Sequence, residues 1–206
     1  MSLKRDQWLA VGITVILISY FLPWLPHPAA GLRLIGLEMG EWVKFLPQVQ
    51  AGQLRPGRDT FYLPPISAGL LLLLMTWYWP HGRWQTWVAR LLAVLVSLLA
   101  LPAIEAIRFD PPATYQQRLW GVGLVIVAAV AIAGSRRLPA WLPTVLLILV
   151  GSVGAIWPLW AYLAVRPMVV EWLGTAVAIG PGIWGNFIGH GLAAITAARA
   201  RPAKPG

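Results

Sequence analysis

Long apolar stretches separated by short polar connections run along most of this chain. A helix that crosses a bilayer needs about 20 predominantly apolar residues, and several stretches approach that length. The sequence therefore predicts an all-α fold, a polytopic membrane helical bundle with six transmembrane helices at residues 8–25, 62–79, 87–107, 115–134, 141–165 and 182–198. The connections leave no room for a separate soluble domain, so residues 1–206 are expected to form a single integral membrane domain.

The longest connection, residues 27–61, has a pattern of its own. Within it Glu38, Glu41 and Lys44 recur every three residues, while apolar residues that include Trp42 take the other side. This spacing is typical of an amphipathic helix, and such a helix is stable in the plane of a membrane interface. We therefore expect an interfacial helix that lies flat on the outer face of the bundle.

The composition agrees with a membrane protein and excludes several kinds of chemistry. Hydrophobic residues make up 58% of the chain and charged residues only 11%, which is far from the balance of soluble domains. The chain has no cysteine, so disulfides, iron–sulfur clusters, thiolate metal sites and cysteine nucleophiles are excluded.

The charges predict an orientation in the membrane. A net charge of +9 does not indicate nucleic acid here, because basic residues of membrane proteins collect in cytoplasmic segments. With the N-terminus inside, Asp6 is the single acid on the cytoplasmic side and the other six acids lie outside. We expect a bacterial cytoplasmic membrane, cytoplasmic N- and C-termini and a first apolar stretch retained as a signal anchor. The expected partners are the lipid bilayer and other membrane subunits.

Tryptophan marks the ends of the predicted spans. The chain contains 13 tryptophans, and an indole ring is favoured at the level of lipid headgroups. An interfacial belt therefore explains the positions near predicted span ends better than a cofactor site does. These positions are Trp8, Trp24, Trp77, Trp79, Trp87, Trp120, Trp141, Trp157 and Trp160.

The last predicted span carries a row of small residues. They recur every four positions and so share one side of a helix, at Gly185, Gly189, Ala193 and Ala197. Small residues in this spacing let two helix backbones approach closely within a membrane. The row is therefore expected to be a helix-packing surface.

Asn186 and His190 form a polar strip beside this row, and three roles are open for it. His190 could ligate a haem iron or the magnesium of a chlorin, with Gly189 and Gly191 leaving room for the flat ring. It could instead carry protons together with an outer carboxylate such as Glu105. As a third role, it could hydrogen-bond a neighbouring helix and fix the packing. The packing role is favoured, and cofactor binding by Asn186 and His190 is the main alternative.

Haem ligation meets one difficulty in the sequence. A six-coordinate haem needs a second axial ligand, and the other histidines, His27 and His81, are predicted at opposite membrane faces. A five-coordinate chlorin, or a ligand from another chain, would avoid this difficulty.

The outer acids are the second candidate cluster. Glu38 and Glu41 are one helical turn apart, and Glu105, Asp110 and Glu171 lie near the outer ends of neighbouring predicted spans. Their oxygen atoms could bind a divalent cation. Several arginines and lysines lie nearby in the sequence, so a surface of paired charges is the favoured interpretation.

The sequence thus favours a non-catalytic structural or accessory subunit of a larger membrane complex. The first alternative is a haem- or chlorin-binding subunit of an electron-transfer or light-harvesting assembly that uses His190. The second is a small transporter or lipid-handling protein. Few ionisable groups lie within the predicted spans, and this argues against both a water-filled path and a self-contained hydrolase.

Overall fold

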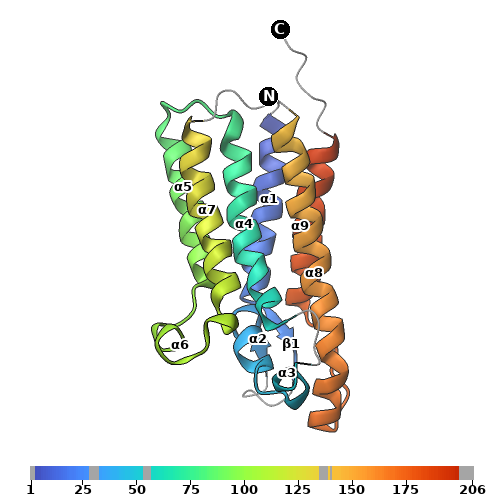
Figure 1. Ribbon diagram of the computed structural model, residues 1–206. Helices are drawn as coiled ribbons and strands as arrows, with labels where there is room; N and C mark the ends of the chain where they lie inside the picture. The colour runs from blue at the N-terminus through green and yellow to red at the C-terminus, as the bar shows by residue number, and fades with distance from the viewer. Residues whose placement is uncertain (1–2, 28–32, 53–56, 135–138, 140, 200–206) are drawn as a thin grey trace.

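The chain folds mainly into helices, in agreement with the all-α prediction. The structure is a computed structural model that describes residues 3–27, 33–52, 57–134, 139 and 141–199. The long helices lie side by side, and α1 begins at the end of the bundle where α9 ends (Figure 1). These helices are α1 (Leu3–Tyr20), α4 (Leu63–Met75), α5 (Trp84–Ser97), α7 (Gln116–Gly134), α8 (Leu142–Leu173) and α9 (Pro181–Arg199). Two 3-10 turns, η3 (Thr76–Tyr78) and η4 (Leu98–Ala100), follow α4 and α5.

Short elements gather at the opposite end of the bundle, and we call them the cap (Figure 1). The cap includes two antiparallel strands in which Pro23 lies opposite Ile35 and Leu25 opposite Leu34. Its elements are β1 (Pro23–Leu25), β2 (Leu34–Ile35), α2 (Gly36–Val43), α3 (Pro47–Gln50), η2 (Arg58–Tyr62), α6 (Ile104–Phe109) and η5 (Pro112–Thr114).

The six-span prediction is not confirmed by helix length and composition. Among the residues that the structure describes, α8 is the one helix both long and apolar enough to cross a membrane. Shorter apolar helices cover residues 84–100 and 116–132. The coarser prediction, a mostly helical all-α fold, is confirmed.

Prolines move two helix ends away from the predicted positions. The third predicted span continued to Ile107, but α5 ends at Ser97 and α6 is separate. Leu101 has an extended backbone, with φ −61° and ψ 138°, because the following Pro102 disfavours the helical conformation. The first predicted span continued to Leu25, but α1 ends at Tyr20 and β1 begins at Pro23.

The fifth predicted span is shorter than the helix in the structure. The apolar stretch ends near Val165, but α8 continues to Leu173 through the cap. Gly174 ends the helix in the left-handed conformation, with φ 65°, which glycine adopts without steric cost.

The predicted packing row of α9 lies against α1 of the same chain. A Cβ atom added to Gly189 would lie 2.8 Å from the carbonyl oxygen of Gly12, and one added to Gly12 would lie 2.8 Å from that of Gly189. A Cβ atom on Gly185 would lie 2.7 Å from that of Ser19. The row ends in Ala193 and Ala197, which are fully buried with apolar residues of α1. The row therefore sets the distance between these two backbones.

The predicted interfacial helix corresponds to α2, which is short and packs against the protein. Met39 and Val43 are fully buried in the core of the cap. The ring of Trp42 contacts that of Trp172 from α8, with 5.6 Å between centroids. The apolar side of α2 therefore faces protein instead of lying flat on lipid.

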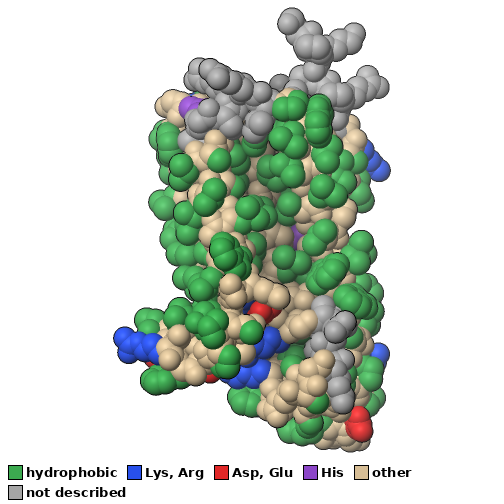
Figure 2. Space-filling model, viewed as in Figure 1, with side chains coloured by type: hydrophobic (Ala, Val, Ile, Leu, Met, Phe, Trp, Pro, Cys, Tyr) green, Lys and Arg blue, Asp and Glu red, His purple; other side chains and the backbone are tan. Residues whose placement is uncertain are grey.

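Apolar side chains cover the outside of the bundle. On the face shown in Figure 2, hydrophobic residues line the long helices, and most charged residues gather at the end that carries the cap. Exposed large apolar residues occur along all the outer helices, for example Ile18, Leu91, Val127, Leu149 and Ile188. An apolar surface of this extent is typical of a surface that contacts a membrane or other proteins.

Candidate functional site

The predicted polar strip of α9 lies at the centre of the bundle. His190 and Asn186 are fully buried. The Nε2 atom of His190 lies 2.7 Å from Ser67 Oγ of α4, and its Nδ1 atom lies 3.0 Å from the backbone oxygen of Asn186. A carbonyl oxygen can only accept, so Nδ1 carries the proton and Nε2 accepts a hydrogen bond from the Ser67 hydroxyl.

A glycine of α8 completes this contact. A side chain on Gly154 would overlap the imidazole of His190, so the ring lies directly against the α8 backbone. The side-chain amide of Asn186 donates to the carbonyl oxygen of Gly154 at 3.1 Å. The strip thus joins α9 to α4 through His190 and to α8 through both side chains.

This geometry does not favour the ligation alternative. Both ring nitrogens of His190 already have hydrogen-bond partners, and a metal would have to replace Ser67. Gly189 and Gly191 were expected to leave space for a macrocycle, but the backbone of α1 fills the space beside Gly189. Gly191 has no atom within 4 Å of an added Cβ atom, so the two glycines do not enclose a common space.

The other histidines lie at the two ends of the bundle. His27 follows β1 in the cap, and His81 precedes α5 at the opposite end. His190, by contrast, lies in the middle of α9.

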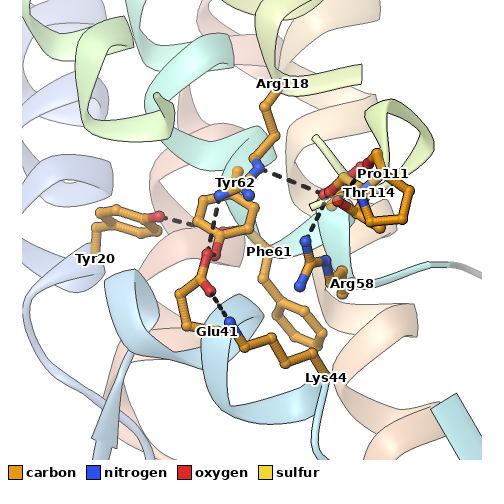
Figure 3. Close-up of polar contacts among 10 residues, drawn as sticks. Tyr20, Glu41, Lys44, Arg58, Phe61, Tyr62, Pro111, Thr114 and Arg118 are labelled. Atoms are coloured by element: carbon orange, nitrogen blue, oxygen red, sulfur yellow. Dashed lines mark hydrogen bonds and ion pairs between the residues drawn. The ribbon is translucent and has the colours of Figure 1, made fainter. Parts of the chain in front are cut away.

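A charged cluster holds the cap to the bundle (Figure 3). Its centre is Glu41 of α2, whose Oε1 atom accepts hydrogen bonds from the Tyr62 hydroxyl at 2.5 Å and from Arg118 Nη1 at 3.0 Å. Its Oε2 atom accepts from Lys44 Nζ at 2.9 Å. Nearby, Arg58 donates to the carbonyl oxygen of Thr114 at 2.8 Å. Residues of α2, η2, η5 and α7 therefore meet in one network.

Arg118 is the buried cation of this network. It is 2% exposed, its guanidinium lies 4.2 Å from the centroid of the Tyr62 ring, and its Nε atom lies 3.6 Å from Asp59 Oδ1. A buried charge is stable only when it is paired, and the carboxylates of Glu41 and Asp59 pair with Arg118 from two sides.

The network shifts the pKa of its two carboxyl groups in opposite directions. Burial alone would raise the pKa of Glu41, but hydrogen bonds from Tyr62 and Lys44 and the charges of Lys44 and Arg118 lower it to about 2. Burial raises the pKa of Asp59 despite the nearby charges of Arg118 and Arg58. Glu41 is therefore the firmly ionised partner of Arg118.

The predicted acid cluster does not form as a group. Glu105 and Glu171 are exposed, and Glu38 accepts a hydrogen bond from the backbone amide of Ile35 at 3.1 Å. In the described part of the chain, no three histidine or acidic side chains are placed to hold a metal ion.

Sequence reasoning missed Arg118 and Tyr62 as partners of Glu41. The signal for Arg118 was its position in the first turn of the apolar α7, where an unpaired charge would be costly. Nothing in the spacing of the sequence connects Arg118 to Glu41, which is 77 positions earlier in the chain, or to Tyr62, which is 56 positions earlier.

No protein family, curated protein or solved structure matches this chain. The contacts described above are therefore the basis for any functional proposal.

Replacing Glu41 with Gln should destabilise the protein at pH 7 by about 1–2 kcal/mol, because Arg118 loses its best partner. The pKa of Glu41 in the folded protein is about 2, against 4.5 ordinarily. Its contribution is therefore complete above pH 4.5 and is lost as the pH falls through 2. Thermal unfolding of detergent-solubilised protein should show a difference between wild type and Glu41→Gln that narrows below pH 4.5.

The exposed Glu171 provides the control for this prediction. Glu171→Gln should match the wild type at every pH. A constant difference between wild type and Glu41→Gln down to pH 2 would contradict the assigned role of the Glu41 carboxylate.

Proposed function

We propose that the chain is a multi-pass integral membrane protein and a non-catalytic subunit of a larger membrane complex. In this proposal α1, α4, α5, α7, α8 and α9 cross the bilayer and the cap lies on the outer side. The observation that carries the proposal is a contrast between apolar side chains over the outside of the bundle and polar groups that pair with each other inside it.

The dimensions of the shorter helices support this arrangement. Residues 84–100 form α5 and η4, which at 1.5 Å per residue extend about 25 Å. This length approaches the hydrocarbon thickness of about 30 Å. The outward side chains Leu91 and Leu95 of α5 and Val127 and Val130 of α7 are all exposed, as lipid-facing residues would be.

Exposed tryptophans support two membrane interfaces. At the end opposite the cap, Trp84 and Trp87 lie in the first turn of α5 and Trp141 directly precedes α8, whereas Trp120 lies in the first turns of α7 at the cap end. Indole rings at two levels separated by the length of the bundle are typical of a transmembrane protein.

The closed interior supports a non-catalytic role. A serine nucleophile needs a path for the substrate and donors for the oxyanion. Ser67 is only 3% exposed, and its hydroxyl also lies 2.8 Å from the Leu63 oxygen and 3.0 Å from the Pro64 oxygen. The Ser67–His190 contact is better suited to helix packing, as buried serines commonly are in membrane bundles.

Single cysteines test the orientation cleanly, because the chain has none of its own. Ala51 in the cap and Gln85 at the start of α5 are both exposed. We expect a membrane-impermeant maleimide to label Ala51→Cys in intact cells and to label Gln85→Cys only after the membrane is broken. Equal labelling of both variants in intact cells would contradict the proposed crossing of the bilayer.

Assembly tests the proposed role as a subunit. After mild solubilisation of native membranes, we expect the protein to migrate on a native gel well above the mass of a single chain. Phe109 of α6 is 81% exposed, the most exposed large apolar side chain among the described residues. Phe109→Ser should shift part of the protein to the single-chain position, because a large apolar contact would be lost.

Phe45, which is 68% exposed elsewhere in the cap, provides the matched control, and Phe45→Ser should leave the assembly unchanged. Migration of the wild-type protein as a single chain would refute the accessory-subunit proposal.

A further inference from the structure

The helix α6 projects from the side of the cap and buries none of its own residues. Figure 1 shows it at the left, below the ends of α5 and α7. None of its six residues is buried, and its large apolar side chains, Ile104, Ile107 and Phe109, are all exposed. Apolar side chains gathered on a projecting segment are typical of an interaction surface. We therefore ask what kind of molecule could cover α6.

The chain on both sides of α6 holds the helix in place. Pro102 precedes it and Pro111 follows it, and the ring of each proline restricts the backbone. The hydroxyl of Tyr115 donates a hydrogen bond to the carbonyl oxygen of Ile107 at 3.4 Å. A surface that is already ordered loses little conformational freedom on binding, and this favours association.

Glu105 and Arg108 lie at the centre of the exposed side of α6. They are three residues apart and therefore neighbours on one side of the helix. Ile104 is four residues before Arg108, and Phe109 is four residues after Glu105, so each charge has an apolar neighbour on that side. Both charges are exposed, and in the described part of the chain neither forms a salt bridge. The surface thus presents one acid and one base between apolar side chains.

This arrangement of charges is complementary to itself. In an antiparallel pair of α6 helices the order of residues is reversed, so Glu105 faces Arg108 of the partner subunit, and Arg108 faces the partner subunit's Glu105. A twofold axis at right angles to the helix produces this pairing. A lipid surface would also cover the apolar side chains, but it would not require an acid and a base one turn apart. The charges therefore favour a second copy of the chain.

We propose that α6 is the contact between two copies of this chain in a twofold-symmetric dimer. The proposal rests on the proposed role as a subunit and deepens it, because it names the partner at the Phe109 surface. A six-residue helix covers less area than a stable interface needs. Exposed apolar side chains next to α6 along the chain, Leu98, Leu101 and Trp120, would extend the contact. A twofold axis along the membrane normal would keep both caps on the outer side.

Charge reversal in two differently tagged copies of the full chain tests this contact. In the dimer, Glu105→Arg places two like pairs of charges opposite each other, and so does Arg108→Glu. After coexpression and mild solubilisation, each variant should therefore recover its own second copy about tenfold less than the wild type does.

Restoring the charge pairs should restore the dimer. When Glu105→Arg is coexpressed with Arg108→Glu, opposite charges face each other again, so each variant should recover the other as well as wild-type copies recover each other. The double variant Glu105→Arg/Arg108→Glu should likewise pair with itself. A variant that had merely misfolded would not be rescued in this way.

Two exposed charges elsewhere on the molecule provide matched controls. Arg83 lies at the end opposite the cap, and Glu171 lies near the end of α8. Arg83→Glu and Glu171→Arg make the same changes of charge outside the proposed contact. Both variants should recover their own second copies as the wild type does.

Three results would overturn the proposal: no recovery between wild-type copies, wild-type recovery by the single variants, and no rescue in the coexpressed pair. The native gel separates this failure from failure of the accessory-subunit proposal. A complex above the mass of a single chain, without recovery between tagged copies, would assign the surface to a different protein. Migration as a single chain would contradict both proposals and leave contact with lipid as the role of α6.

Discussion

The close approach of α9 to α1 and α8 is the constraint on which the rest of the structure depends. Gly12 and Gly189 pack backbone against backbone, and Gly154 leaves space for the imidazole of His190. Because the helices are this close, His190 reaches Ser67 on α4. A larger residue at any of these glycines would separate the backbones and break the central hydrogen bonds, since protein interiors do not absorb added volume without strain.

Within the described part of the chain two arginines are buried, Arg118 at the cap and Arg90 toward the opposite end, and their surroundings differ. At the cap, the carboxylates of Glu41 and Asp59 flank Arg118, and the cluster ties several chain segments together. At the other end, Arg90 has no hydrogen-bond partner among the described residues. The cap is therefore stabilised from within the chain. In both cases the low polarity around a cation makes its partner important.

Hydropathy predicted a mostly helical fold, and residue spacing predicted a row of small residues on one side of a helix, but neither identified which elements would pack together. The four-residue spacing of Gly185 and Gly189 identified a surface that contacts another helix, yet it could not tell a contact with α1 from one with another protein. Trp24, expected at the lipid interface, is fully buried in the cap. The extension of α8 beyond Val165 depends on contacts such as Trp42 with Trp172, which join distant parts of the chain.

The most direct test of the central claim is cross-linking of α1 to α9. A Cβ atom at Gly185 would lie 2.7 Å from Ser19 Cβ, and a small shift would bring this distance to the roughly 3.8 Å of a disulfide. After oxidation, Ser19→Cys/Gly185→Cys should resist maleimide until it is reduced. Ser19→Cys/Gly191→Cys should remain labelled, because Gly191 has no neighbour within reach. Equal labelling of the two oxidised pairs would contradict the packing of α9 against α1.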